Sequence, residues 1–147
     1  MVTQRVVFDT NVLLSLWAFA DSRYAPLRGE VEAGRWTALT RTDCLAEFRR
    51  VLGYPRFRLS DARQEALWAD YAAASICVTA AVDAPPLPRC QDRDDQKFLE
   101  VARDGQAHCL VTGDKLLLKL ARRQKMQHLF RIITPDVALA ELQAHCG

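Results

Sequence analysis

Four acidic residues stand where their side chains could bind a divalent cation: Asp9, Glu47, Asp95 and Asp114. Each lies at or beside the start of an expected helix or on the edge of an apolar helix face. Carboxylates gathered at such places repel one another unless a positive charge lies between them. Oxygen ligands without histidine or cysteine suit Mg²⁺ or Mn²⁺, and such an ion can activate water for hydrolysis. The acids therefore predict metal-dependent hydrolytic chemistry.

Taken singly, three of these acids have an ordinary structural explanation. Asp9 and Asp114 each follow an apolar strand, so either side chain can simply cap the helix that comes next. Glu47 borders an apolar helix face formed by residues 44, 45, 48, 51 and 52, and from there it can extend to solvent. It is their occurrence together that favours one common site.

Asp95 is harder to explain as a helix-forming residue. It precedes Phe98 and Leu99 by three and four residues, so it points to the same face as these apolar side chains. Asp92 can already supply the N-cap, and Asp94 can face solvent. A carboxylate on the inward face of a helix needs a partner, because burial of an unpaired charge is costly.

Alternating strands and helices must position these acids. Strands are predicted at 5–8, 36–39, 76–78, 108–111 and 131–133, and helices at 11–20, 24–33, 42–53, 60–74, 92–105, 115–120 and from 134 onward. Expected N-caps are Asp9 or Thr10, Thr42 or Asp43, Ser60, Asp92, Asp114 and Thr134. This order predicts an α/β fold, a three-layer sandwich with a small central parallel sheet flanked by helices. Ligands of such sheets bind outside the carboxyl ends of the strands, where Asp9 and Asp114 lie.

The composition suits one globular domain over residues 1–147. A net charge of +2 does not by itself indicate a nucleic-acid binder, and the basic clusters at 49–58 and 122–125 suit a solvated surface equally well. Five widely spaced cysteines without a C-x-x-C pair indicate reduced thiols. No apolar run is long enough to span a bilayer. We expect a soluble, cytoplasmic protein with no membrane partner.

At this point the pattern of motifs resembles a known family. The matching segments are FDTNV at 8–12, EF with VL at 47–52, DRDDQKFL at 92–99 and LVTGD at 110–114. In order and spacing they resemble the PIN-domain nucleases, and among these the VapC-like toxins of bacterial toxin–antitoxin pairs. The resemblance covers nearly the whole chain and implies a small parallel sheet between helices, with metal-dependent cleavage of RNA.

Carried over position by position, the resemblance implies roles for particular residues. Asp9, Glu47, Asp95 and Asp114 look like the metal-binding and catalytic acids, with polar support from Asn11, Thr112 and Asp92. Asp9 and Asp95 would hold the main ion, and Glu47 would orient the water. One departure is Arg93, which stands where relatives often have proline, so that the loop into the helix is less rigid.

The sequence therefore predicts an Mg²⁺- or Mn²⁺-dependent endoribonuclease that acts as the toxin of a toxin–antitoxin pair, with RNA as substrate and an antitoxin protein as partner. We expect a homodimer, because residues 12–19 are more apolar than one helix face requires. The residues expected to contact RNA phosphates are Arg41, Arg49, Arg50 and Lys115.

Two other functions compete with this prediction. A phosphoacceptor receiver domain also carries acids at strand ends, but it needs an acidic pair after the first strand, where this chain has Asp9-Thr10-Asn11. A non-catalytic RNA- or protein-binding module on the same fold is the closer alternative. The presence of all four acids favours the enzyme over that module.

Overall fold

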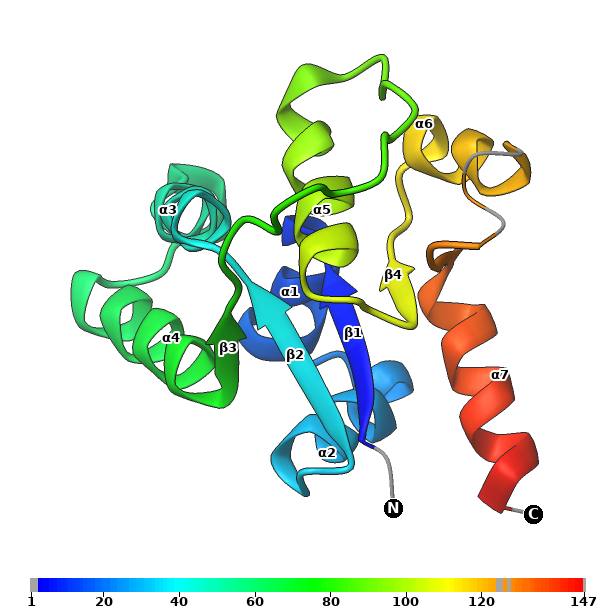
Figure 1. Ribbon diagram of the computed structural model, residues 1–147. Coiled ribbons are helices and arrows are strands. Elements are labelled where there is room, and N and C mark those ends of the chain that lie inside the picture. Colours follow the sequence, from blue (N-terminus) through cyan, green and yellow to red (C-terminus); the bar gives the residue numbers. More distant parts are fainter. Residues whose placement is uncertain (1–2, 124–125, 127, 147) are drawn as a thin grey trace.

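The fold is organised around a five-stranded, fully parallel sheet (Figure 1). The computed structural model describes residues 3–123, 126 and 128–146. The strands are β1 (Gln4–Phe8), β2 (Trp36–Thr40), β3 (Ser75–Cys77), β4 (Cys109–Val111) and β5 (Arg131–Ile133). They are ordered β3-β2-β1-β4-β5. The predicted α/β fold with a small parallel sheet is confirmed.

The strand order creates a natural binding position beside β1. From β1 the chain builds the sheet outward in one direction through β2 and β3, and then returns to the other side of β1 with β4 and β5. The direction of winding therefore changes between β1 and β4. Open parallel sheets bind ligands at this kind of position, outside the carboxyl ends of the strands. In Figure 1 these ends lie toward α5 and α6.

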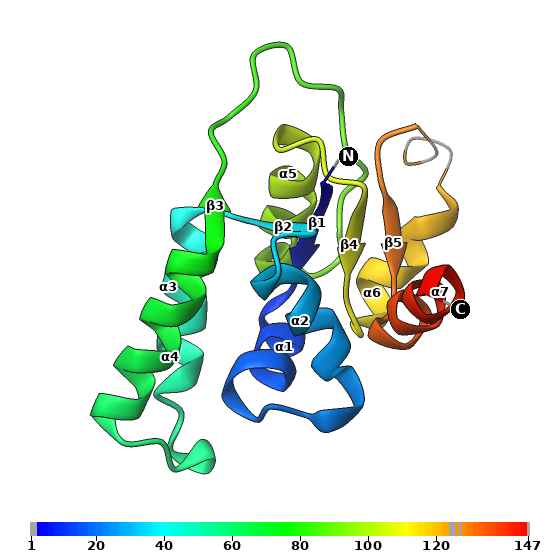
Figure 2. The ribbon, with the colours of Figure 1, turned by 90° about the horizontal axis from the view of Figure 1, so that it is seen from below.

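Helices cover both faces of the sheet (Figure 2). Alternate side chains of β1 point to opposite faces, as in any pleated strand, so Val6 and Phe8 join one apolar cluster and Val7 joins another. The first cluster is closed by α1 (Thr10–Leu13), α2 (Ala25–Glu32), α4 (Asp61–Ala74) and α7 (Pro135–Cys146). The second is closed by α5 (Gln96–Asp104) and α6 (Lys115–Leu118), while α3 (Thr42–Leu52) contributes side chains to both.

Most of the predicted helix starts are confirmed by their capping hydrogen bonds. Ser60 Oγ accepts the Arg63 N–H at 3.1 Å, and Thr134 Oγ1 accepts the Val137 N–H at 3.1 Å. The prediction for α3 was wrong. That helix already includes Thr42 and follows Arg41, which makes no side-chain cap. The Asp43 carboxylate instead accepts the N–H of Cys44 at 3.0 Å and pairs with Arg41.

The single helix expected at 11–20 was also wrong. The α-helical part ends at Leu13, and Leu14–Ala18 forms the π-helical segment η1. The wider turn explains how one short stretch buries an unusual number of apolar side chains, since residues on more than one α-helical face point inward. Those buried side chains are Val12, Leu13, Leu14, Leu16 and Trp17.

Several other helices are preceded or followed by a short 3₁₀ turn that the sequence did not predict. The turn η2 (Ser22–Tyr24) leads into α2, η4 (Arg93–Asp95) into α5, and η5 (Lys119–Arg122) follows α6. A further turn, η3 (Pro55–Phe57), lies between α3 and α4. Since 3₁₀ turns are common at helix ends, these differences shift boundaries without changing the order of elements.

Two further observations concern the helices and the cysteines. Within the part that the structure describes, no helix has the length and apolar character needed to cross a membrane. The thiols of Cys44, Cys77, Cys90 and Cys109 are free. For these four residues, the prediction of unpaired cysteines is confirmed.

Candidate active site

Two of the predicted acids are brought to the same edge of the sheet by strand pairing. Asp9 directly follows β1, and Asp114 lies three residues beyond β4. These strands are neighbours with Phe8 opposite Val111, and the Asp9 N–H donates to the Val111 carbonyl at 3.2 Å. Parallel pairing in this register forces the two acids toward one another, as the sequence predicted.

The carboxylate of Asp9 is buried and held on both sides. Only 4% of the residue is exposed. Its Oδ1 accepts the Val12 N–H at 2.8 Å, which caps α1, and its Oδ2 accepts the hydroxyl of Thr112. Burial raises the pKa of Asp9, and the hydrogen bonds from Thr112 and Val12 partly counteract this rise. Asp9 is therefore both the helix cap and a member of the acid group.

Thr112 connects Asp9 to Asp114. Its side chain is fully buried. The hydroxyl donates to Asp9 and accepts the Asp114 N–H at 3.0 Å, so one small side chain fixes the backbone at Asp114 and the orientation of Asp9. Thr112, predicted as a polar support, thus contacts two of the predicted acids.

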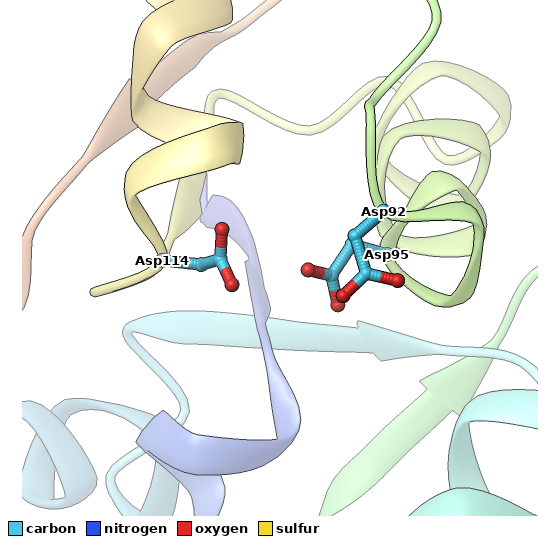
Figure 3. A group of neighbouring side chains, drawn as sticks. All are labelled: Asp92, Asp95 and Asp114. Carbon is cyan, nitrogen blue, oxygen red and sulfur yellow. The ribbon is translucent and has the colours of Figure 1, made fainter.

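Three carboxylates converge at this edge of the sheet: those of Asp92, Asp95 and Asp114 (Figure 3). One ligand oxygen from each of Asp92, Asp95 and Asp114 lies within 4.8 Å of the others. Asp92 and Asp95 extend from the start of α5, and Asp114 faces them from the start of α6. The structure thus brings Asp92, predicted only as a cap and support, into direct proximity with two of the predicted metal-binding acids.

The helix starts hold two of these three carboxylates. Asp92 Oδ1 accepts the Asp94 N–H at 3.0 Å, and Asp114 Oδ1 accepts the N–H groups of Leu116 and Leu117 at 2.8 and 3.3 Å. Each therefore uses one oxygen for capping, while its other oxygen takes no part in a capping bond. The predicted caps at Asp92 and Asp114 are confirmed, and capping does not prevent either residue from facing the cluster.

Asp95 also has a raised pKa. Partial burial raises its pKa to about 7, with further contributions from the negative charges of Asp114, Asp92 and Asp9. The donor set is entirely carboxylate oxygen, which is the preferred environment of Mg²⁺, Mn²⁺ or Ca²⁺. A divalent cation would remove the repulsion that raises this pKa, so the residues present fit such an ion.

Glu47 lies apart from the three-carboxylate cluster and has its own partners. From α3 it forms an ion pair with Lys97 of α5, and its Oε1 accepts the hydroxyl of Thr10 at 2.5 Å. Both side chains of the ion pair are about 15% exposed or less. The charge of Glu47 is therefore balanced by a cation of the chain itself. Sequence reasoning missed Lys97, although the residue stands two positions after Asp95.

The acids line one cavity of about 240 Å³. It lies outside the carboxyl ends of β1 and β4, where parallel sheets bind ligands. Its wall combines acids with a few aromatic and basic side chains. The lining residues are Asp9, Thr10, Asn11, Glu47, Arg50, Val51, Tyr54, Arg56, Asp92, Asp94, Asp95, Phe98 and Asp114.

Of the four basic residues expected at the substrate, only Arg50 lines this cavity. Arg41 pairs with Asp43 and Glu100. Arg49 pairs with Glu65 at 2.7 Å and lies over the ring of Trp68. Lys115 is exposed and is not among the lining residues.

Two lining residues, Tyr54 and Arg56, were missed by sequence reasoning. Two signals were present: the proline between them, which predicted a break in the chain, and the basic cluster at 49–58, which contains Arg56. Asn11, the remaining predicted support, is exposed and lines the cavity as expected.

Comparison with known proteins adds one match. The sequence model of a family described as PIN domain matches residues 5–116. The matched region contains Asp9, Glu47, Asp92, Asp95 and Asp114. Searches among curated proteins and among solved structures gave no match.

Proposed function

From the premise that the chain belongs to the PIN-domain family, we propose that it is a divalent-metal-dependent endoribonuclease. Proteins of this family are generally metal-dependent nucleases, and the acid cluster fits such a metal. The observation that carries the proposal is the convergence of Asp92, Asp95 and Asp114 within 4.8 Å, inside a cavity at the ends of the central strands. RNA as the substrate rests on the resemblance of the motifs to the VapC-like group.

In this proposal Asp92, Asp95 and Asp114 hold Mg²⁺ or Mn²⁺, and Asp9 lies beside them as a further negative charge. When bound, such an ion lowers the pKa of a coordinated water and neutralises charge that develops on phosphate. Asp9 is fixed by Thr112 and Val12, so it contributes charge at a defined position. In this proposal these residues act by binding and orientation.

Glu47 is proposed to orient the attacking water. Its carboxylate lines the same cavity and is fixed by Thr10 and Lys97, so it can accept a hydrogen bond in a constant direction. Arg50 and Arg56 line that cavity and are proposed to contact phosphates on either side of the cleaved bond. Arg50 was already expected from the sequence to contact phosphates.

Cleavage of a mixed RNA pool in the presence of Mn²⁺ tests this function. We expect cleavage by the native chain, no cleavage in EDTA, and loss of activity in Asp95→Asn. Asp83→Asn is a matched control, because Asp83 is an exposed aspartate outside the cavity. If Asp95→Asn cut RNA as fast as the native protein, the assignment would be wrong.

A second function, non-catalytic RNA or protein binding, is favoured by one observation. Lys97 already neutralises Glu47, so part of the acid group needs no metal ion. This alternative predicts RNA binding without cleavage in Mn²⁺, in the native chain and in Asp95→Asn alike. The two functions are therefore separated by the same assay.

We propose further that the chain is the toxin of a toxin–antitoxin pair and acts in the cytoplasm. Support comes from the resemblance to the VapC-like group. The test is growth arrest when the chain is produced in bacteria, relief by co-production of the protein encoded beside it, and no arrest with Asp95→Asn. Growth at the normal rate would contradict the toxin role.

A homodimer also remains a proposal. The apolar residues that suggested it are accounted for within one chain, since Val12, Leu13, Leu14, Leu16 and Trp17 are buried. Phe19 alone of that stretch is a large exposed apolar residue. Light scattering at high protein concentration distinguishes a dimer from a monomer.

A further inference from the structure

An aromatic and basic surface lies at the edge of the acidic cavity. We call it the aromatic rim, and it consists of Phe19, Tyr54, Arg56 and Phe57. Tyr54 and Arg56 line the cavity. The rings of Tyr54 and Phe57 are stacked, with centroids 6.2 Å apart and planes inclined by 19°, and Phe19 meets Phe57 edge-on at 5.1 Å. The rim therefore continues the site outward as a surface of rings.

The backbone holds this surface in a fixed conformation. Pro55 opens the 3₁₀ turn η3, and the N–H groups of Phe57 and Arg58 donate to the carbonyls of Tyr54 and Pro55 at 3.0 and 3.1 Å. Arg58 then takes a left-handed conformation with φ of 53° and reverses the chain toward α4. Because proline also restricts φ, the backbone of this turn need not be ordered when a ligand binds.

Packing within the chain explains only part of the rim. Tyr54 and Phe57 are half-buried and pack against the core on one side. Phe19, however, is 50% exposed, although a large aromatic side chain gains most free energy when buried. Arg56 is exposed, and its guanidinium lies 5.4 Å from the centroid of Tyr54 and 4.9 Å from that of Phe57.

The arginines that line the cavity leave their charge available to a ligand. Of the arginines that the structure describes, some, such as Arg28, Arg41 and Arg49, form ion pairs with carboxylates, and others on the surface do not. Among the described residues, no carboxylate forms an ion pair with Arg50 or Arg56, although both line a cavity rich in acids. Two arginines without a carboxylate partner, one of them in contact with half-buried rings, match a ligand that carries both phosphates and flat apolar groups.

We propose that the aromatic rim is a subsite for single-stranded RNA, in which one unpaired base stacks on Tyr54 and Phe57 and its phosphate contacts Arg56. This inference rests on the proposed ribonuclease function and specifies the form of RNA. Bases in a duplex are already stacked on their neighbours, so only an unpaired base presents its face to these rings. The rim therefore selects unpaired nucleotides next to the acid cluster.

The test measures binding separately from cleavage. Fluorescence anisotropy is recorded with three probes: a short labelled oligouridylate, an abasic oligomer of equal length and charge, and an RNA duplex. All proteins carry Asp95→Asn, so that no probe is cut. The second substitutions are Tyr54→Leu, Tyr54→Phe, Arg56→Gln and the control Arg122→Gln, an exposed arginine outside the rim and the cavity.

A stacking subsite gives a specific pattern of affinities. The parent protein should bind oligouridylate more tightly than the abasic oligomer. Tyr54→Leu should weaken binding of oligouridylate by about tenfold and abolish the preference for bases, whereas Tyr54→Phe should retain it. Arg56→Gln should weaken both single-stranded probes, and Arg122→Gln should change neither. Thermal unfolding establishes that each variant is folded. If Tyr54→Leu does not fold, the parent protein's preference for oligouridylate over the abasic oligomer and the loss of affinity in Arg56→Gln still test the subsite.

The outcomes also distinguish failure of the proposed subsite from failure of the proposed enzyme function. If the native chain cuts RNA but Tyr54→Leu binds each probe as tightly as the parent protein does, the rim is not a base subsite. Loss of binding to a protein partner with unchanged RNA binding also overturns it, because the rim would then be a protein contact. If the native chain does not cut RNA while base-dependent binding through Tyr54 is seen, the subsite stands and the enzyme function fails.

Discussion

Lys97 of α5 forms an ion pair with Glu47 of α3, so these two helices are joined beside the acid cluster. Lys97 also donates to the carbonyl oxygen of Asp94, which ties this ion pair to the turn that carries Asp95. The charge of Glu47 is thus neutralised by a lysine of the chain, whereas Asp92, Asp95 and Asp114 form a cluster of like charges. This difference determines how the site should respond to mutation, to pH and to metal.

Replacement of Lys97 by methionine should destabilise the metal-free protein. The substitution leaves the carboxylate of Glu47 unpaired at a largely buried position, which costs about 2–3 kcal/mol. Added Mn²⁺ should restore more stability in Lys97→Met than in the native chain, because the cation then screens an additional negative charge. Urea unfolding with EDTA and with Mn²⁺ measures both effects. Lys119→Met, at an exposed lysine of η5, is the control, and equal losses in the two variants would contradict the prediction.

Asp95 should make the metal-free protein less stable as the pH rises. Its pKa is about 7 in the folded chain, above the ordinary value of 3.8, so the folded state binds the proton more tightly than the unfolded state does. The associated stability is fully present below about pH 4 and is lost as the pH rises through about 7.

Asp95→Asn should therefore stabilise the metal-free protein at about pH 8 by about 1–2 kcal/mol, after allowance for solvent screening. The difference in unfolding free energy from the native chain should shrink as the pH is lowered toward about 4. Urea unfolding in EDTA across this range provides the measurement. A difference that is constant with pH would mean that Asp95 is not protonated in the folded protein.

Metal affinity should depend on pH for the same reason. A proton must leave Asp95 before its oxygen can bind a cation, so the affinity for Mn²⁺ should fall about tenfold for each pH unit below about 7. Calorimetric titration of the EDTA-treated chain between about pH 8 and about pH 6 checks this slope. Proton release on binding, seen as a dependence of the heat on the buffer, should accompany it. Affinity that does not change with pH would exclude Asp95 as a ligand.

Thr112→Val should destabilise the protein although it hardly changes the volume of the side chain. Asp9 Oδ2 would lose its buried donor and the Asp114 N–H its acceptor, at a cost of about 1–3 kcal/mol. The pKa of Asp9 should rise further, since the hydrogen bond from Thr112 now lowers it. Thr112→Ser keeps the hydroxyl and should stay within about 1 kcal/mol of the native chain. If serine and valine cost the same, the methyl group would matter rather than the hydroxyl.

Local patterns in the sequence were sufficient to predict the sheet edge that carries the site. Short apolar segments alternating with helices predicted parallel strands, and parallel strands place all their carboxyl ends on one edge. Asp9 and Asp114 had to meet there once β1 and β4 became neighbours. Helix periodicity was less decisive for residues 11–20, because a stretch with apolar residues on several faces suits a π-helical turn as well as a buried α-helix.

The sequence by itself determined which residue types stand at the ends of the strands and the starts of the helices, because those are local properties. It could not determine which carboxylate oxygens cap a helix and which face the acid cluster. A cap and a metal ligand require the same residue type, and only the packed chain decides which oxygens face the cluster at Asp92 and which are held by Thr112 at Asp9. The pairing of Lys97 with Glu47, and the place of Tyr54 and Arg56 on the rim, likewise depend on distances between helices, and no local pattern encodes such distances.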